Sequence, residues 1–453
     1  MGVKVPPPLA VVMPTRNQAA FLAASVASVL ADGVALTLIV QDGASTDDTP
    51  QLLAALAARH PALSILSQSD SGPAEALNRG FERALATGAP VIGWLNSDDL
   101  YTPGALRRAL DHLAAHPQHV AVYGEAEHVD ADGRVLGRYP TLPPEAPLAR
   151  WRDACPICQP TMVLRREAVQ ALLPLDTTLR TAFDFDLWLR LFKAYPGRIG
   201  HLGAVQAQSR LHVEGITLRM RERVALEGMQ VVHRNLGAAP AHWLVTHVAE
   251  ALQACPFNAE PAQVQGHLLQ LADQAAAWME PGGAAALKQQ MQASRAWQLA
   301  LPHCVTSVHA DGWTGPELEL RVLQPAGAHG AVRLLRLHGR HAWPRPGRLR
   351  LTLSAWHGGR QVAAHAVWWR QRFVLDLPVH DHRPGARLRF QVRADGSFVP
   401  AEVVAGSQDR RRLAFIVESL EAVKAAEGTQ TAPAEGAAAM PVADDSHGSR
   451  PGP

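Results

Sequence analysis

The first part of the chain alternates short apolar runs with longer alanine-rich stretches, and this alternation limits the folds open to it. The runs are four or five residues long and end in polar clusters. Strands that alternate with helices predict a mostly parallel central sheet with helices on both faces. Ligands of such sheets bind beyond the carboxyl ends of the strands. The predicted strands are 9–13, 36–40, 63–66 and 91–95, and the predicted helices are 21–30, 50–59, 73–86 and 103–116.

The composition and pattern of the sequence change after this α/β region, and these changes divide the chain into four parts. Residues 6–237 form the α/β domain, and residues 238–300, rich in Ala, Gln and Leu, are expected to be a helical linker. Strand-like runs separated by Gly and Pro turns in 301–425 predict a small antiparallel β-sandwich. Residues 426–453 are rich in Ala, Gly and Pro and are expected to be a disordered tail.

Composition and charge narrow the classes of function. The 453 residues are 47% apolar, which supports large cores and excludes a mainly disordered protein. Lys and Arg number 43 against 41 Asp and Glu, so bulk charge gives no reason to expect a nucleic-acid partner. Four cysteines cannot form a disulfide scaffold in a chain of this length. No apolar run approaches the about 18 residues of a membrane span, so a cytoplasmic protein is expected.

Five polar motifs lie in a fixed order along the first half of the chain. They are PTRNQ at 14–18, QDGASTDDT at 41–49, SDSGPAEALNRG at 69–80, WLNSDDLY at 94–101 and FDFDLWLR at 183–190. Together they resemble the motifs of family 2 glycosyltransferases, which are nucleotide-sugar enzymes with the GT-A fold. Two further blocks, ICQPTMVLRRE at 157–167 and SRLHVEGIT at 209–217, resemble bacterial members. The resemblance covers about residues 8–236 and implies a GT-A-type nucleotide-sugar-binding domain.

Asp98 and Asp99 end the fourth predicted strand. Adjacent carboxylates at a sheet end are costly without a cation, and their oxygen atoms favour a hard ion, Mg²⁺ or Mn²⁺. We predict a metal site at these two residues, where the ion would bridge a diphosphate. A capped turn before the next helix is the alternative. The family often has an acidic residue where this chain has Asn96, whose amide oxygen can still bind ribose or metal.

The nucleotide side is predicted from the first three motifs. Asp42 and Gly43 follow the second strand, where a carboxylate can accept hydrogen bonds from a base or ribose; a helix-capping loop is the alternative. Gly72 lets the backbone approach a ligand closely, or is an ordinary turn glycine. The resemblance implies nucleotide-sugar contacts at Pro14, Thr15, Asn17, Asp42, Gly43, Asp70, Gly72, Asn78, Asn96 and Asp98, and positive charge near the diphosphate from Arg210 and His212. A strand-end surface pair is the alternative for Arg210 and His212.

Asp184 and Asp186 flank Phe185 at the start of a predicted amphipathic helix. An aspartate in a first helical turn is stabilised by the helix dipole, so a capping role is open to either residue. The resemblance implies that Asp184 is the general base, and a base needs one carboxylate within hydrogen-bond reach of the acceptor hydroxyl. Asp186 is expected to be structural or to lie on the acceptor side.

Other residues with reactive or aromatic side chains have plainer interpretations. Cys155 and Cys158 have CxxC spacing without a matching second pair, so buried structural cysteines are expected. The 21 histidines show no close ligand pattern, and packing or surface roles are expected for them. The β-rich part has tryptophans that could stack on sugars or fill its core, and arginines that could meet anionic glycans or form a solvated strand face. The tryptophans are 313, 343, 356, 368 and 369, and the arginines are 333, 336, 340, 345, 348 and 350.

These features predict an inverting, metal-dependent glycosyltransferase. The donor would be a nucleotide diphosphate sugar, and the acceptor a glycan or lipid-linked glycan in the synthesis of cell-surface polysaccharide. Such an acceptor leaves open a peripheral association with the inner face of the cell membrane. A different hypothesis is a degenerate transferase that acts as a glycan-binding or scaffold protein through its C-terminal β-domain.

Overall fold

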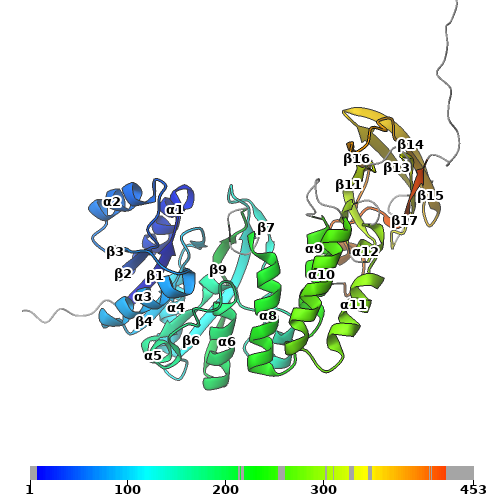
Figure 1. Ribbon diagram of the computed structural model, residues 1–453. Helices are drawn as coiled ribbons and strands as arrows, with labels where there is room; N and C mark the ends of the chain where they lie inside the picture. Colours follow the sequence, from blue (N-terminus) through cyan, green and yellow to red (C-terminus); the bar gives the residue numbers. More distant parts are fainter. Residues whose placement is uncertain are drawn as a thin grey trace, which may run out of the picture. The chain divides into compact units, whose positions relative to one another are not determined.

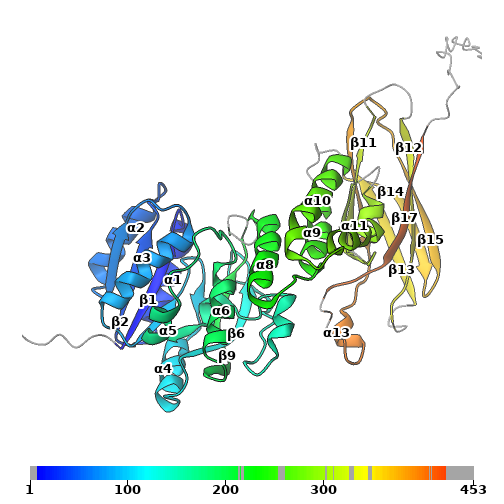
Figure 2. The same cartoon turned by 60° about the horizontal axis from the view of Figure 1, so that its bottom comes forward.

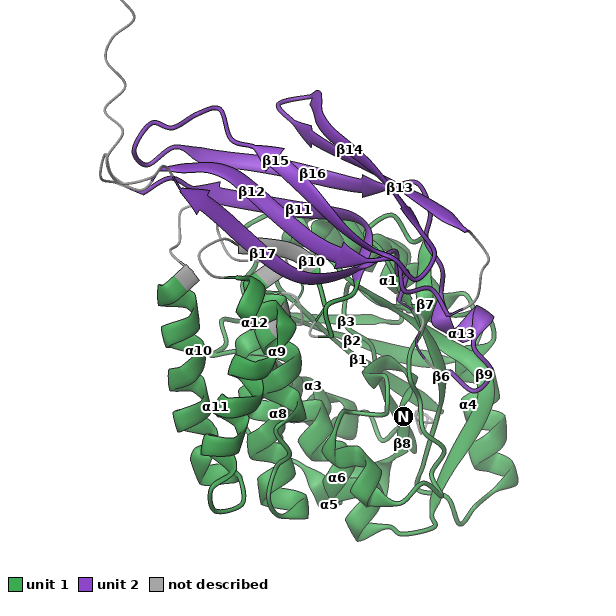
Figure 3. Ribbon diagram, turned by 90° about the vertical axis from the view of Figure 1, so that its right-hand side faces the viewer, with its two compact units in different colours: residues 1–313 green, residues 314–453 purple. Residues whose placement is uncertain are grey.

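The computed structural model describes residues 8–212, 215, 219–253, 261–300, 304–309, 311–325, 331–344, 349–407, 409 and 411–424. The chain divides into two compact units, Met1–Trp313 and Thr314–Pro453 (Figure 3). The expected tail at 426–453 lies outside the described residues. The predicted class, an α/β domain of GT-A type followed by helices and antiparallel β-structure, is confirmed.

Unit 1 is built on a nine-stranded sheet whose first part is parallel (Figure 1). In it β1 lies between β2 and β4, and β2 pairs with β3. All eight elements predicted for this region form, with ends that differ from the predicted ones by at most two residues. They are β1 (Leu9–Thr15), α1 (Ala19–Leu30), β2 (Leu36–Asp42), α2 (Thr49–Arg59), β3 (Leu63–Ser67), α3 (Pro73–Ala86), β4 (Val91–Trp94) and α4 (Ala105–Ala115).

Beyond β4 the sheet is mixed rather than parallel, and here it differs from the predicted sheet. Its strand order is β3-β2-β1-β4-β8-β6-β9-β5, with β7 paired to β6. Antiparallel neighbours need only a short turn, such as residues 130–134 between β6 and β7, so no crossover helix marks them in the sequence. The additional elements are β5 (Leu100–Tyr101), β6 (Ala121–Val129), β7 (Val135–Arg138), η1 (Leu148–Arg152), η2 (Gln159–Thr161), β8 (Val163–Arg165), α5 (Arg166–Leu172), α6 (Phe183–Ala194) and β9 (Ile199–Arg210).

Helix α3 shows how the helices of unit 1 pack against the sheet. Ala74, Leu77, Phe81 and Ala84 recur at helical spacing and are all buried. Gly80 lets the helix lie close to β1, because a Cβ atom there would be 2.4 Å from Cγ1 of Val12. This close contact fixes the start of α3, which lies beside the polar cluster that follows β3.

The described parts of residues 238–300, which were predicted as a helical linker, fold as helices that share a core with the α/β domain. Their buried side chains, such as Leu244 and Leu271, belong to the same apolar cluster as Phe81 and Trp188. Helix α8 packs beside α6 (Figure 1 and Figure 2). Among the described residues no helix is both long enough and apolar enough to span a bilayer. These elements are α8 (Arg221–Leu236), α9 (His242–Gln253), α10 (Pro261–Ala275), η3 (Ala276–Trp278), α11 (Gly283–Ala293), α12 (Arg295–Leu299) and β10 (Cys304–Val308).

Unit 2 is formed by two antiparallel sheets that each bury alternate side chains. One contains β11, β16, β13 and β14 in that order, and the other contains β15, β12 and β17. Alternating burial along both sheets is typical of a β-sandwich, as predicted. The elements are β11 (Thr314–Leu323), β12 (Val332–Arg340), β13 (Arg350–His357), β14 (Arg360–Trp368), β15 (Arg372–Pro378), β16 (Arg387–Ala394), α13 (Pro400–Val403) and β17 (Ile416–Lys424).

The aromatic and basic residues of unit 2 have largely structural surroundings. Trp343 is buried and donates a hydrogen bond to the Ala414 carbonyl, and Trp369 donates to the Trp343 carbonyl at 2.9 Å. Trp368, by contrast, is exposed. Arg336 points to solvent on β12 and forms an ion pair with Asp376 at 2.8 Å, as expected for a solvated strand face. Arginines 345 and 348 lie outside the described residues.

Candidate active site

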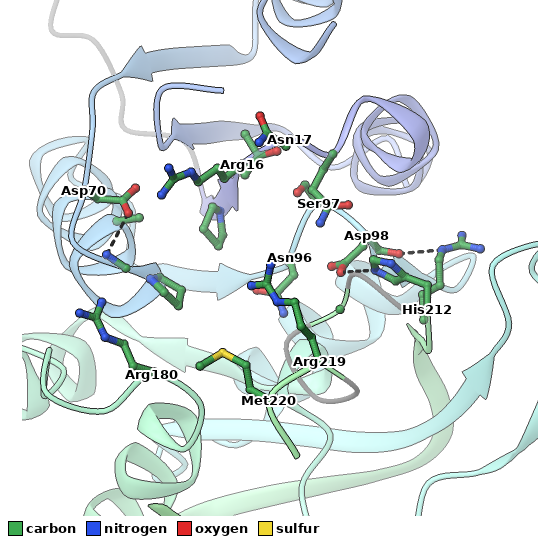
Figure 4. A pocket seen from close by; sticks show the side chains of 18 of the residues that line it. Arg16, Asn17, Asp70, Asn96, Ser97, Asp98, Arg180, His212, Arg219 and Met220 are labelled. Carbon is green, nitrogen blue, oxygen red and sulfur yellow. Dashed lines mark hydrogen bonds and ion pairs between the residues drawn. The ribbon is translucent and has the colours of Figure 1, made fainter. Parts of the chain in front are cut away.

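A cavity of about 660 Å³ opens at one edge of the large sheet (Figure 4). Thr15 ends β1, Asn96, Ser97 and Asp98 follow β4, and Arg210 ends β9; all of them line this cavity. These three strands run in the same direction, so their carboxyl ends meet at the same edge. The sequence therefore predicted the correct edge of the sheet, as expected for parallel α/β architecture.

The lining of the cavity carries more positive than negative side chains. Among the residues that the structure describes, its carboxylates are Asp70 and Asp98. Figure 4 shows Asp70 and Arg180 on one side, Asp98 and His212 on the other, and Arg219 between them. Fixed guanidinium groups around a cavity favour an anionic ligand such as a phosphate ester. The arginines that line the cavity are Arg16, Arg180, Arg210 and Arg219.

The two neighbouring carboxylates of the fourth motif point in different directions. An Asp98 oxygen lies 3.0 Å from Nε2 of His212, and both residues line the cavity. Asp99 is buried, does not line the cavity, and accepts the Arg210 backbone N–H at 2.9 Å. Burial, and then the charge of Asp98, raise the pKa of Asp99 well above its usual range. The predicted pair is thus divided: Asp98 faces the cavity with His212, and Asp99 ties the turn to β9.

Asn96 and Arg210 are held by several interactions around this turn. The Asn96 amide oxygen accepts the Trp94 indole N–H at 2.9 Å, and its amide group donates to Asp99 at 3.4 Å. The Arg210 guanidinium donates to the carbonyls of Asp98 and Ala131 at 2.9 and 2.8 Å. These contacts leave Arg210 at the cavity wall as a fixed positive charge.

The residues predicted to surround the nucleotide base are divided between the cavity wall and the loop that follows β2. Pro14, Thr15 and Asn17 line the cavity, and the hydroxyl of Thr15 is buried without a hydrogen-bond partner among the described residues. Asp42 is fully buried and does not line the cavity. Its carboxylate accepts the hydroxyls of Ser45 and Ser67, both at 2.5 Å. Asp42 therefore orders the loop after β2.

Gly43 and Gly72 both make room for charged side chains near the cavity. A Cβ atom on Gly43 would lie 2.5 Å from the Asp70 carboxylate. Gly72, which has φ of +149°, would meet the Arg180 guanidinium at 2.1 Å if it carried a Cβ atom. The Gly72 N–H donates to Asp70 at 3.0 Å. Burial raises the pKa of Asp70, opposed by this hydrogen bond and by Arg16.

Asn78, by contrast, is engaged away from the cavity. Its amide donates to the Leu175 carbonyl at 3.0 Å and accepts the Leu175 N–H at 2.7 Å. This reciprocal pair joins α3 to the segment before α6, and Asn78 is not among the lining residues. The structure thus gives Asn78 a structural role, in place of the predicted nucleotide contact.

Asp184 lies in the first turn of α6, next to Phe183, which lines the cavity. Its carboxylate accepts the Phe185 N–H at 2.8 Å, and burial raises its pKa to about 6. Asp186 is occupied elsewhere, in an ion pair with Arg190 at 2.8 Å. Asp184 itself is not among the lining residues, but its side chain is half-buried and directly follows Phe183 of the cavity wall in the chain.

The start of α6 is held by a buried glutamate that the sequence did not reveal. Glu227 on α8 accepts the backbone N–H groups of residues 180, 181 and 182 and the Thr181 hydroxyl, at 2.7–3.1 Å. These N–H groups belong to the segment that leads into α6, and a carboxylate there also lies at the positive end of the helix dipole. Glu227 therefore positions Arg180 and Asp184. No local pattern marks it, because its partners lie far away in the sequence.

The cysteines of the CxxC pair are structural, as predicted. Cys155 and Cys158 are free, and the Cys155 thiol donates to the Ile157 carbonyl at 3.3 Å. Burial, and the negative charge of Asp184, raise the pKa of the Cys155 thiol. Both thiols are therefore held protonated and unreactive.

Comparison with known proteins agrees with the motif order. The family model described as "Glycosyl transferase family 2" matches residues 10–173. Chondroitin synthase from Escherichia coli is 24% identical over 240 residues, which are 51% of this chain and 33% of that protein. Succinoglycan biosynthesis protein ExoU from Rhizobium meliloti is 27% identical over 212 residues, 42% of this chain and 58% of that protein. The chain thus spans less than two thirds of the length of either relative.

Solved structures with a similar arrangement were also found. The structure of TarS residues 1–349 from S. aureus has a TM-score of 0.43 at 14% identity and covers 63% of this chain and 90% of that one. A mannosyltransferase from Pyrobaculum calidifontis has a TM-score of 0.40 at 20% identity and covers 65% of this chain and 82% of that one.

The resemblance inferred from the five motifs is confirmed by the family match over residues 10–173. That span includes β1 to β4 and the residues from Pro14 to Asp98 that line the cavity. Residues 10–173 of the N-terminal domain match the model of glycosyl transferase family 2, and the chain is similar to that family over this span.

Proposed function

We propose that the chain is an inverting glycosyltransferase that moves a sugar from a nucleotide diphosphate sugar to an acceptor hydroxyl. The observation that carries the proposal is the cavity in which arginines and His212 surround Asp98 at the carboxyl edge of the sheet. The names of the two relatives, a chondroitin synthase and a succinoglycan biosynthesis protein, favour a glycan or lipid-linked glycan of a cell-surface polysaccharide as acceptor. A lipid-linked acceptor would bring the enzyme to the inner face of the cell membrane.

The donor binds through the negative charges of its diphosphate and through residues at the carboxyl end of β1. Arg16, Arg180 and Arg219 place guanidinium groups at the cavity, where they would bind the diphosphate. A guanidinium group can donate two parallel hydrogen bonds to phosphate oxygens. Thr15 contributes a buried hydroxyl that has no partner among the described residues, and a ligand oxygen would satisfy it. The base and ribose lie against Pro14 and Asn17, while Asp42 acts indirectly by ordering its loop.

Asp98 together with His212, rather than with Asp99, would hold a divalent ion. The carboxylate oxygen and the imidazole nitrogen are 3.0 Å apart and line the cavity, whereas Asp99 does not. One carboxylate and one imidazole suit Mn²⁺ better than Mg²⁺, because Mg²⁺ prefers oxygen ligands only. A bound ion of this kind supplies Lewis-acid stabilisation of the leaving diphosphate.

Asp184 is the general base in this proposal. The acceptor oxygen attacks the anomeric carbon on the face opposite the diphosphate, and its proton passes to the Asp184 carboxylate. The new carbon–oxygen bond forms as the bond to the diphosphate breaks, and the nucleoside diphosphate leaves with that electron pair. The pKa of about 6 suits this task, because the carboxylate is ionised near neutral pH yet basic enough to take a proton.

Calorimetric titration with UDP and with GDP, each in Mn²⁺ and in EDTA, tests the donor site. We expect micromolar binding of one nucleotide in Mn²⁺ that weakens about 10-fold or more in EDTA, equivalent to about 1.4 kcal/mol. Asp98→Asn removes the Mn²⁺ effect. Asp132→Asn, whose carboxylate is exposed on the β6–β7 turn, is the matched control and binds like the wild type.

Two results would contradict the proposal. One is the failure of wild-type protein to bind either nucleotide in Mn²⁺. The other is nucleotide binding that depends equally on Mn²⁺ in the wild type and in Asp98→Asn.

A further inference from the structure

Three histidines lie together at the C-terminal end of α4 and in the loop that follows it. His112 is in the last turn of the helix, His116 directly follows it, and His119 precedes β6. One ring nitrogen from each lies within 4.8 Å of the other two. Nε2 of His112 and Nδ1 of His119 are 3.0 Å apart. This is close to the about 3.3 Å between two nitrogens of a tetrahedral zinc site with bonds of about 2.05 Å.

The hydrogen bonding of His116 prepares its other nitrogen for a ligand. Its Nδ1 lies 2.9 Å from the His112 carbonyl oxygen. A carbonyl oxygen only accepts, so Nδ1 carries the hydrogen, and in a neutral ring Nε2 then keeps its lone pair. Metal-binding histidines are commonly oriented by such a bond from the second nitrogen.

A glycine on the neighbouring strand makes room for the cluster. A Cβ atom at Gly200 on β9 would lie 2.1 Å from Nε2 of His112 and 2.8 Å from Nδ1 of His119. Because residue 200 has no side chain, the two ring nitrogens have room to lie next to each other. A Cβ atom built at Gly203, on the same strand, would meet nothing within 4 Å.

The charge state of the rings is compatible with metal binding. Partial burial, and the neighbouring histidines, lower the pKa of His112. Burial, His116 and Arg165 lower the pKa of His119. Neutral imidazole is the form that binds metal ions, and the lowered pKa values of His112 and His119 favour that form.

We propose that His112, His116 and His119 bind one Zn²⁺ ion through three imidazole nitrogens, with the fourth position open to water or another ligand. Three nitrogen ligands favour a borderline ion such as Zn²⁺ over Mg²⁺ or Mn²⁺. The site is separate from the donor cavity. Gly200 lies near the start of β9 and Arg210 at its end, about 30 Å apart at about 3.3 Å per residue. The inference does not rest on the proposed transferase activity.

Calorimetric titration of the metal-free full-length chain with Zn²⁺ alone tests this site. Loss of an outer-shell partner of a ligand costs about 10–100-fold in affinity, so loss of a ligand is expected to cost at least as much. We expect His116→Gln and Gly200→Ala to weaken one Zn²⁺ site at least about 10-fold. Gly203→Ala, the matched glycine control, and Asp98→Asn, which marks any zinc bound in the donor cavity, leave that site unchanged.

The outcome decides between the two places where zinc could bind. Wild-type affinity in a folded His116→Gln protein overturns the proposal, as does the loss of all Zn²⁺ binding in Asp98→Asn. Far-ultraviolet circular dichroism in EDTA checks that each variant is folded. If Gly200→Ala does not fold, His116→Gln decides alone, because its side chain is half-buried and directly follows the end of α4.

Discussion

Asp98 and Asp99 are neighbours in the chain, yet their carboxylates meet different surroundings. Asp98 faces the cavity beside His212, while Asp99 accepts a backbone N–H from Arg210. The sequence could place two carboxylates at the end of a buried strand. It could not tell which one faces a ligand, because that depends on a partner on β9, a strand that no local periodicity connects to this turn. The same reason explains why Asn78 was predicted at the nucleotide and lies against Leu175.

Asp184 gives a prediction for the pH dependence of transfer. Its pKa, raised to about 6 by burial, means that it is ionised above that pH and protonated below it. We therefore expect kcat/KM to rise with pH up to about 6 and then to level off, because a general base acts in its ionised form. Asp184→Asn is expected to lower kcat by about 10²–10⁴-fold and to remove this rise.

The control for this pH dependence is Asp132→Asn, which is expected to keep the wild-type profile because its carboxylate is exposed. Initial rates between pH 5 and about 8, measured with the nucleotide that binds in the calorimetric assay, supply the comparison. Full turnover in Asp184→Asn would refute the assignment of the base.

At the scale of elements, the segment that leads into α6 depends on a side chain from α8. Glu227 accepts hydrogen bonds from the N–H groups of residues 180–182. Its replacement by Gln puts an NH2 group, which only donates, in place of one of the two accepting oxygens. We expect Glu227→Gln to lower the free energy of unfolding by about 1–3 kcal/mol. The variant should also raise the KM for the donor, since Arg180 lines the cavity. Urea denaturation and steady-state kinetics measure the two effects.

Glu222 on the same helix is the matched control, because its carboxylate is largely exposed beside His267. Glu222→Gln is expected to change the free energy of unfolding by less than about 0.5 kcal/mol. Equal effects from the two substitutions would mean that Glu227 does not support α6.

The elements that could be predicted from the sequence are those whose pattern is local. β1 to β4 are apolar runs separated by helices with a buried stripe, and their bounds agree with the sequence. β8 has three residues and β5 has two, too few for any periodicity to appear. Their pairing with β4 and β9 is decided by tertiary contacts. The mixed half of the sheet therefore could not be predicted from local patterns, and Arg210 was expected at the site only from the resemblance of its motif.

At the scale of the whole molecule, every residue that lines the cavity belongs to unit 1. Unit 2 has its own core, in which Phe390 is fully buried. We expect Phe390→Ala to lower the free energy of unfolding of unit 2 by about 3–5 kcal/mol. The same variant should leave the Kd for nucleotide and Mn²⁺ unchanged, as measured by calorimetry. Phe81→Ala, the matched change in the core of unit 1, is expected to destabilise unit 1 instead. A Kd raised 10-fold or more in folded Phe390→Ala would contradict this separation of tasks.

The cavity is assembled from chain segments that begin at Pro14 and end at Met220. During synthesis from the N-terminus, the first strands and helices of unit 1 are available early, but His212 and Arg219 follow only after β9. Contacts between such distant segments form late in folding, because the long intervening loops must close first. A nascent chain that has completed β1 to β4 therefore has a partial sheet and no donor site. Binding competence arises only when nearly all of the α/β domain has been made.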